Sequence, residues 1–290
     1  YEKILVPVDN SAFSQHAVSA AVSLGKAFRS SVTCFHAYAA RLHERSFMKL
    51  EPALPQEYRD VAKMAEQREY HGALIEKGLR AISDSYLQKA EEKFHAAGVR
   101  CCVKSVEGKN FQAIVKEAES GDHDLIILGA HGLGKVKSGL LGSVCQRVVR
   151  HTDKDALVIK GPLELTGGEL LVAMDGSLQS FAGLSKALEL AHTFDMKVGA
   201  LSVYDPQFHY RVFNSLVEVL SQEARSIFPM EHQERLHTAV IDQGLKRVAQ
   251  GYLEEAKKAG AQRGIPVDTW LLEGKPFDAI LDFLKERRPS

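Results

Sequence analysis

The sequence repeats itself once at long range, and this duplication constrains the fold more than any other feature. Residues 4–11 read Ile-Leu-Val-Pro-Val-Asp-Asn-Ser, and residues 170–177 read Leu-Leu-Val-Ala-Met-Asp-Gly-Ser. The same offset of 166 residues aligns Glu107-Gly108-Lys109 with Glu273-Gly274-Lys275, near the other end of the repeat. Because one offset holds at both ends, the segments between them have the same net length. The period is far longer than that of a solenoid repeat, so the sequence predicts a duplicated domain.

The chain of 290 residues is long enough for two domains, which we place at residues 1–162 and 168–290. The second copy is expected to be incomplete, because the counterpart of Gly129 would fall at residue 295, beyond Ser290. Either the second copy never had this segment or the natural protein is longer. Since a missing central strand would be structurally costly, we expect a longer protein.

Apolar runs alternate with segments of helical spacing along both copies. In the first copy the pattern predicts a polar insert at 39–75, strands at 3–8, 31–37, 99–106, 124–130 and 155–160, and helices at 13–28, 77–97, 110–120 and 142–152. The second copy repeats this order through 170–174, 178–194, 197–203, 244–260, 266–272 and 276–287. This alternation predicts an α/β fold with two tandem open parallel five-stranded sheets, the second incomplete at its C-terminus. Ligands in such sheets bind outside the carboxyl ends of the strands, at the switch point.

Charge and hydropathy argue against several classes of function. The formal net charge is zero and the pI is near 7.3, so we expect no basic face for nucleic acid or membranes. No segment has the apolar length of a membrane span, and we expect no signal peptide. The cysteines are too few and too scattered for a disulfide framework: Cys34, Cys101, Cys102 and Cys145. We therefore expect a protein of the reducing cytoplasm with buried or partly buried thiols.

One glycine-rich segment, residues 129–143, carries the chemistry of the first copy. It reads Gly-Ala-His-Gly-Leu-Gly-Lys-Val-Lys-Ser-Gly-Leu-Leu-Gly-Ser and connects the fourth predicted strand to a helix. Glycines let backbone amides approach phosphate oxygens, and the N-terminus of a helix attracts anions. Ser143 is placed to cap that helix and to contact a phosphate, while Lys135 and Lys137 add positive charge. His131 would face either a phosphate or solvent, and a glycine loop without a ligand is the alternative interpretation.

This segment resembles the nucleotide motif of the universal stress protein family. That motif is a glycine, two residues, a glycine, nine residues, a glycine and then serine or threonine, and Gly129, Gly132 and Gly142-Ser143 match it without insertion. The run Pro7-Val8-Asp9-x-Ser11 and the residue His36, which end the first two predicted strands, are also similar to the family. The resemblance implies a Rossmann-like fold of the adenine-nucleotide alpha-hydrolase type.

The resemblance also implies a role for each matched residue. The backbone of Ala37 would meet the adenine, and Pro7 and Asp9 would lie against the nucleoside, with Asp9 near the ribose or a nucleotide-bound Mg²⁺. The glycines and the residues after Gly142 would hold the ribose and phosphates. The implied ligand is ATP, or ADP or AMP. The predicted nucleotide-binding residues are Pro7, Val8, Asp9, Ala37, Gly129, His131, Gly132, Gly134, Lys135, Gly142, Ser143 and Val144.

The second copy departs from the motif, which leaves nucleotide binding there open. Ala173 stands at the position of Pro7, and Ser202 stands at the position of His36. The acidic residue and the serine after the first strand are retained. The second candidate site therefore consists of Asp175, Ser177 and Val203.

The implied function is that of a cytoplasmic ATP-binding protein of the stress response, in which nucleotide occupancy changes a surface for a protein partner. The two copies would form an internal pseudo-dimer through the strand at 155–160, and further homo-oligomers stay open. No nucleophile, base and orienting acid recur in a recognisable arrangement, so no catalytic residue is predicted. Two alternatives remain: a slow ATP hydrolase that uses Asp9, and a nucleotide-independent ligand-binding or interaction module that uses the apolar stretch at 208–220.

Overall fold

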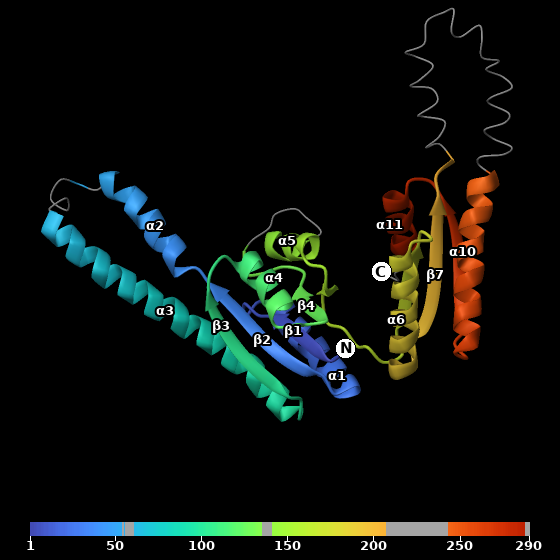
Figure 1. The fold of residues 1–290 in the computed structure, drawn as a ribbon, viewed down its shortest axis with the longest axis horizontal. Coiled ribbons are helices and arrows are strands. Elements are labelled where there is room, and N and C mark those ends of the chain that lie inside the picture. Colours follow the sequence, from blue (N-terminus) through green and yellow to red (C-terminus); the bar gives the residue numbers. More distant parts are fainter. Residues whose placement is uncertain (54, 56–60, 135–140, 207–242, 288–290) are drawn as a thin grey trace, which may run out of the picture. The chain divides into compact units, whose positions relative to one another are not determined.

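The protein divides into two compact units, Tyr1–Glu164 and Leu165–Ser290. The computed structural model describes residues 1–53, 55, 61–134, 141–206 and 243–287. Three features singled out from the sequence lie outside these residues: Lys135, Lys137 and the apolar stretch at 208–220. Figure 1 shows the helices and strands of each unit.

The first unit is built on a parallel sheet of five strands in the order β3-β2-β1-β4-β5. The central strand β1 (Lys3–Pro7) pairs with β2 (Ser31–Tyr38) on one side and with β4 (Leu125–Gly129) on the other. The edges are β3 (Cys101–Glu107) and β5 (Asp155–Ile159), and every pairing is parallel. The chain adds strands first on one side of β1 and then on the other. The switch point of the sheet therefore lies between β1 and β4.

Helices cover both faces of this sheet. On one face, α1 (Ala12–Phe28) and α3 (Val61–Ala96) contact each other, and on the other α4 (Asn110–Ser120) contacts α5 (Ser143–His151). Side chains of a strand alternate between its two faces, so each strand contributes to both layers of the core. The buried cluster under α4 and α5 consists of Leu5, Phe35, Ala37, Ile114, Ala118, Ile126, Leu128, Cys145 and Val148.

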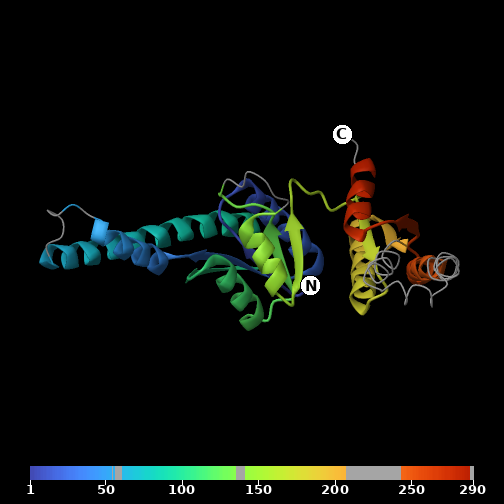
Figure 2. The same ribbon diagram turned by 90° about the horizontal axis from the view of Figure 1, so that it is seen from above.

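The insert between β2 and β3 is more helical than the sequence predicted. The expected helix spanned 77–97, whereas α3 extends from Val61 to Ala96. The buried side chains of α3 are Met64 and, between Ser83 and Phe94, a group in the second half of the helix, which is the half that packs on β2 and β3. The insert also contains α2 (Ala40–Leu50), which packs on α3, and the short 3-10 helix η1 (Glu51–Ala53). Figures 1 and 2 show α2 and the first half of α3 extending together beyond the sheet.

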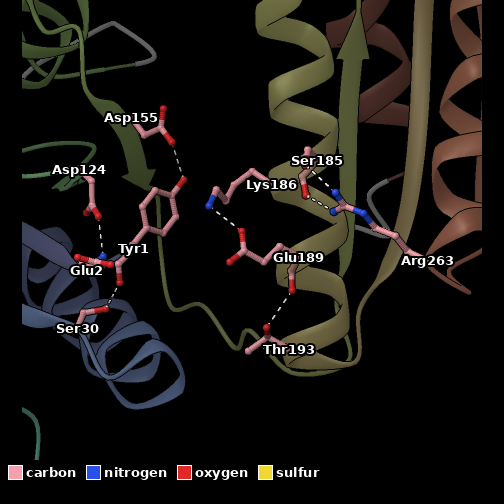
Figure 3. Close-up of polar contacts among 10 residues, drawn as sticks. All are labelled: Tyr1, Glu2, Ser30, Asp124, Asp155, Ser185, Lys186, Glu189, Thr193 and Arg263. Atoms are coloured by element: carbon pink, nitrogen blue, oxygen red, sulfur yellow. Dashed lines mark hydrogen bonds and ion pairs between the residues drawn. The ribbon is translucent and has the colours of Figure 1, made fainter.

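Polar contacts fasten the first residues of the chain to the amino-terminal ends of the strands (Figure 3). The Tyr1 hydroxyl donates to Oδ2 of Asp155 at 2.8 Å, and Ser30 Oγ donates to the Tyr1 carbonyl at 2.6 Å. The backbone N–H of Glu2 donates to Oδ2 of Asp124 at 2.6 Å. Since these partners precede or begin β2, β4 and β5, they hold the start of β1 in register with the rest of the sheet.

The second unit repeats the first three strands of the first. β6 (Glu169–Met174), β7 (Lys197–Tyr204) and β8 (Val267–Glu273) form a parallel sheet in the order β6-β7-β8. The helix α6 (Leu178–Phe194) follows β6 as α1 follows β1. The buried cluster of this unit consists of Met174, Leu184, Leu188, Ala191, Val198, Ala200, Leu253, Ala256 and Val267.

Two further helices complete the described part of the second unit. α10 (Gln243–Gln262) packs on β7 and β8, and α11 (Pro276–Arg287) follows β8. The guanidinium of Arg263, just after α10, donates to the carbonyl and to Oγ of Ser185 on α6 at 3.0 and 2.9 Å (Figure 3). This pair of bonds fixes the end of α10 against α6.

The predicted α/β fold with tandem parallel sheets is confirmed, with five strands in the first unit and three in the described part of the second. None of the described helices combines the length and the apolar character that a membrane crossing requires. In the first unit the carboxyl ends of β1 and β4 meet at one edge of the sheet, where folds of this type bind ligands.

Candidate functional site

A cleft of about 410 Å³ opens at the carboxyl edge of the first sheet. Its walls come from the ends of β1, β2 and β4 and from the first turns of α4 and α5. The structure brings eleven of the twelve predicted residues to this cleft, and the twelfth, Lys135, lies outside the described residues. The eleven are Pro7, Val8, Asp9, Ala37, Gly129, His131, Gly132, Gly134, Gly142, Ser143 and Val144.

The carboxylate of Asp9 holds the start of the glycine loop. Its Oδ1 accepts from the backbone N–H of Ser11 at 3.0 Å, and its Oδ2 accepts from the N–H of Leu133 at 3.2 Å. A Cβ atom at Gly132 would overlap Oδ2 of Asp9, so only glycine lets the loop come this close. Asp9 therefore shapes the loop as well as facing the cleft.

Two more motif glycines permit close backbone packing at the ends of the loop. A Cβ at Gly129 would lie 2.8 Å from the backbone of Phe13 and Ser14, at the start of α1. A Cβ at Gly142 would lie 3.2 Å from the carbonyl oxygen of Ala130, which accepts from the Gly142 N–H at 2.7 Å. The two ends of the loop are thus joined directly, and a larger residue at either position would separate them.

The first turn of α5 faces the cleft without a side-chain cap. Gly142 is the N-cap residue, with φ −66° and ψ 155°, and it makes no side-chain cap hydrogen bond. The prediction that the Ser143 hydroxyl caps this helix is wrong, because Ser143 is the first helical residue and lies one position past the cap. An uncapped helix start with its amides at a cleft is a suitable site for an anion.

His131 lies at the cleft and also packs against the start of α1, so its contact with a phosphate stays a prediction. Its ring is half-buried and packs edge-on against Phe13, with ring centroids 5.1 Å apart. Its carbonyl oxygen accepts from Ser11 Oγ at 3.3 Å, and the same hydroxyl accepts from the backbone N–H of Ser14 to cap α1. His131 therefore anchors the loop to the start of α1.

His36, absent from the predicted nucleotide-binding residues, also lines the cleft. Its Nδ1 lies 2.8 Å from Oγ of Ser83 on α3, and this hydroxyl lies 2.7 Å from Oγ of Ser105 on β3. Burial lowers the pKa of His36, and the charge of Asp9 opposes that shift. The imidazole is therefore mainly neutral at pH 7 and connects the cleft to α3.

Asn110 is another lining residue that the sequence did not single out. It is the first residue of α4, whose N-cap, Lys109, makes no side-chain cap hydrogen bond. The sequence does distinguish Asn110, because the repeat aligns this polar residue with Pro276 in the second copy. The buried Ser83 had no comparable signal, since a serine on a predicted helix normally faces solvent.

The second unit repeats the turn after its first strand but fills the space beside it. Oδ1 of Asp175 accepts from the N–H and the hydroxyl of Ser177 at 2.9 and 2.6 Å, and these hydrogen bonds lower the pKa of Asp175. Gly176 has a φ of +81°, and the ring of Tyr252 occupies the position of a Cβ there. Val203, the third residue of this candidate site, is half-buried near the end of β7.

The comparison with protein families identifies both copies. The model of the universal stress protein family matches residues 1–160 and, a second time, residues 168–290. The chain belongs to the universal stress protein family. A universal stress protein of Methanocaldococcus jannaschii is 29% identical over 162 residues, which cover 56% of this chain and 84% of the relative.

Solved structures of this family share the fold. A universal stress protein from Archaeoglobus fulgidus aligns with 98% of this chain and 83% of its own, at 15% identity and a TM-score of 0.56. Another member was solved in complex with cAMP; it aligns with 55% of this chain and 96% of its own, at 23% identity and a TM-score of 0.36.

Proposed function

We propose that the first unit binds an adenine nucleotide, ATP or a close relative, and that occupancy of the cleft regulates a surface for a protein partner in the cytoplasm. The observation that carries this proposal is the cleft at the switch point, where the uncapped start of α5 and three tightly packed glycines meet. Backbone amides at a helix start bind phosphates without any side-chain charge.

Different residues around the cleft would bind different parts of the nucleotide. The amides that begin α5, at Ser143 and Val144, would hold phosphate oxygens. The apolar residues Phe35, Ala37 and Ile114 would enclose the base, and their burial keeps that end of the cleft dry. If Mg²⁺ accompanies the nucleotide, Asp9 is the carboxylate at the cleft that would approach it, and the ion would balance phosphate charge.

The route from the cleft to a partner surface would start at His36. Its contact with Ser83 joins the cleft to the middle of α3, and α3 extends with α2 away from the sheet (Figure 1). A nucleotide that moves His36 therefore acts on a helix that presents apolar side chains to solvent. Tyr70 and Leu74 are 67% and 71% exposed on α3. We propose this pair of helices as the regulated surface.

The hydrolase alternative gains no support from the contacts of Asp9. Each of its oxygens accepts one backbone N–H group, so the contacts of the carboxylate are explained by its role in holding the loop. Among the described residues, no group of three or more His, Cys, Asp or Glu side chains is arranged to hold a metal. The pairing of the two copies through β5 stays a prediction.

Nucleotide binding is tested by mass spectrometry of small molecules released from the purified protein, followed by calorimetric titration with ATP. The variant Gly142→Glu places a carboxylate at the start of α5, where it would repel phosphate and push against Ala130. The matched control is Gly161→Glu, because a side chain there meets open space. We expect about one nucleotide per chain in the wild type and the control, and none in Gly142→Glu. If the wild type neither carries nor binds adenine nucleotide at millimolar ATP, the proposal is wrong.

A further inference from the structure

The cleft has two chemically different ends. The glycine loop and α5 lie beside β4, whereas the start of α4 lies beside β2, and β1 separates the two. Neighbouring strands are about 4.8 Å apart, so the two ends are separated by about 10 Å, which suits the span from a nucleotide's base to its phosphates. If phosphates bind at α5, the base lies between β2 and α4.

The base end is apolar except at its rim. Phe35 and Ile114 are buried and form its walls with Ala37. Ala37 is aligned with Val106 on β3, and the N–H of Gly108 donates to the carbonyl of the next β2 residue at 2.8 Å. The turn into α4 is therefore held against the end of β2. It brings Asn110, the first residue of α4, to the rim of this end.

Most polar side chains around the cleft already have partners. Asp9 accepts two backbone N–H groups of the first unit. Ser14 Oγ accepts from the backbone N–H of Asp9 at 3.2 Å, and His36 pairs with Ser83. These contacts fix the orientation of all three side chains, so each is already positioned by the protein itself.

Three further polar side chains line the cleft, Ser143 and His131 at the end of the glycine loop and Asn110 at the other end. In the part of the chain that the structure describes, neither Ser143 nor Asn110 has a side-chain hydrogen bond. Ser143 belongs to α5 and hence to the phosphate end. Asn110 is the polar side chain left at the base end, where it is exposed to the cleft and to solvent.

Helix formation does not account for asparagine at this position. Asparagine is favoured at the N-cap, but the N-cap of α4 is Lys109, and Asn110 follows it. The second copy has Pro276 at the aligned position, where it begins α11. Proline is preferred at the first helical position, because its missing N–H would have no partner there. The first copy thus has a carboxamide where the fold accepts a residue without any hydrogen-bonding side chain.

We propose that Asn110 reads the purine edge of the bound nucleotide and gives the cleft its preference for adenine; this inference rests on the proposed function. A carboxamide pairs bidentately with adenine, accepting from the 6-amino group and donating to N7. A 6-oxopurine such as guanine or hypoxanthine presents two acceptors on that edge, O6 and N7. The carboxamide oxygen would then lie against an acceptor, so only one of the two hydrogen bonds could form. Asn110 is thereby a specificity-determining residue.

The test compares dissociation constants for ATP and ITP, which differ at position 6 of the purine, by calorimetric titration of the full chain. We expect the wild type to prefer ATP by about tenfold or more, as one bidentate contact gives. The variant Asn110→Pro carries the residue of the second copy, so α4 should form normally. We expect it to bind ATP and ITP with affinities within about twofold of each other. The matched control, Pro276→Asn, should keep the wild-type preference.

The outcomes separate this inference from the function on which it rests. If the wild type binds ATP but Asn110→Pro keeps the full preference over ITP, Asn110 does not read the base and the cleft is still a nucleotide site. A wild type that binds ATP and ITP equally overturns the inference in the same way. Binding of neither nucleotide overturns both. A gain of ITP affinity in Asn110→Arg would add support, since a guanidinium matches the two acceptors of a 6-oxopurine.

Discussion

Asp9 combines two roles at the level of single residues, because it faces the cleft and also holds the glycine loop. Its oxygens accept the N–H groups of Ser11, in the turn after β1, and of Leu133, in the glycine loop after β4. In the described part of the second unit, the contacts of its repeat counterpart, Asp175, are local and involve Ser177 and Ser180 at the start of α6. The same residue type therefore stabilises a local turn in one copy and positions a distant loop in the other.

This difference makes the variant Asp9→Ala informative. Both charged hydrogen bonds are lost, and each is typically worth about 1.5–3 kcal/mol. We expect the first unit to lose about 2 kcal/mol of unfolding free energy or more, and ATP affinity to fall at least tenfold, because the loop loses its anchor. Urea unfolding and calorimetry measure the two effects. Asp175→Ala is the matched control, and an equal loss of ATP affinity in that variant would contradict the assignment.

The neutral state of His36 leads to a prediction about pH. Burial lowers its folded pKa below the ordinary value of 6.5, so the unfolded chain binds the proton more readily. Stability is then fully present above the unfolded pKa and is lost as pH falls toward the folded pKa. We expect His36→Gln to lose less unfolding free energy than the wild type between about pH 7 and pH 5. Identical losses in urea titrations at the two pH values would show that His36 does not titrate in this way.

At the level of residues, sequence analysis located the cleft but misassigned some of its contacts. The glycine spacing was sufficient because close backbone approach depends only on the missing Cβ, as at Gly132. The cap at Ser143 was wrong by one position, since helix starts are set by backbone angles that a sequence does not reveal. The pair of His36 with Ser83 could not be predicted, because it joins β2 to a helix whose buried face was not known.

Among the elements, α3 shows where prediction from periodicity fails. The segment before residue 77 contains Pro52, Pro55 and many charged residues, so the sequence predicted a polar insert at 39–75. In the structure it continues α3 for several turns, because a single buried residue such as Met64 and contacts with α2 suffice to hold it. The strands were easier to predict, since the buried β1 and β4 are short apolar runs bounded by turns.

The helices α1 and α6 begin with the same cap but differ in what the cap supports. Ser11 Oγ accepts from Ser14 N–H and also donates to the His131 carbonyl, whereas Ser177 Oγ accepts from Ser180 N–H and bonds to its own turn. The variants Ser11→Ala and Ser177→Ala should each cost about 1–2 kcal/mol of stability in their own unit. Only Ser11→Ala should also weaken ATP binding, by a few fold, because it frees the loop. Thermal unfolding measures the stability and calorimetry measures the ATP affinity. An unchanged ATP affinity in Ser11→Ala would show that this cap does not contribute to nucleotide binding.

For the whole molecule, the repeat offset was the strongest guide. It predicted two units with the same order of elements, and the parallel sheets of five and three strands have that order. What the offset did not reveal is how far the two copies differ around the same backbone. Tyr252 lies against Gly176 in the second unit, while the aligned Tyr86 packs edge-on against His36 in the first. Duplication preserved the fold and allowed the carboxyl edges of the two sheets to acquire different side chains.

This divergence predicts that a nucleotide stabilises the two units unequally. A ligand that binds only the folded state adds about 2.7 kcal/mol at a concentration 100 times its dissociation constant, which slows globally exchanging amides by about 100-fold. We expect ATP to slow the hydrogen exchange of amides in β1, β4 and α5 of the first unit, because these elements line the cleft. Amides of β6, β7 and β8 belong to a separate buried cluster and should exchange at the same rate with and without ATP. The variant Gly142→Glu supplies the control, since ATP should leave both of its units unchanged. Equal protection of β6–β8 in the wild type would mean either a second nucleotide site or energetic coupling between the units. Repeating the measurement on Asp175→Ala would distinguish these two explanations, because only a second site depends on that carboxylate.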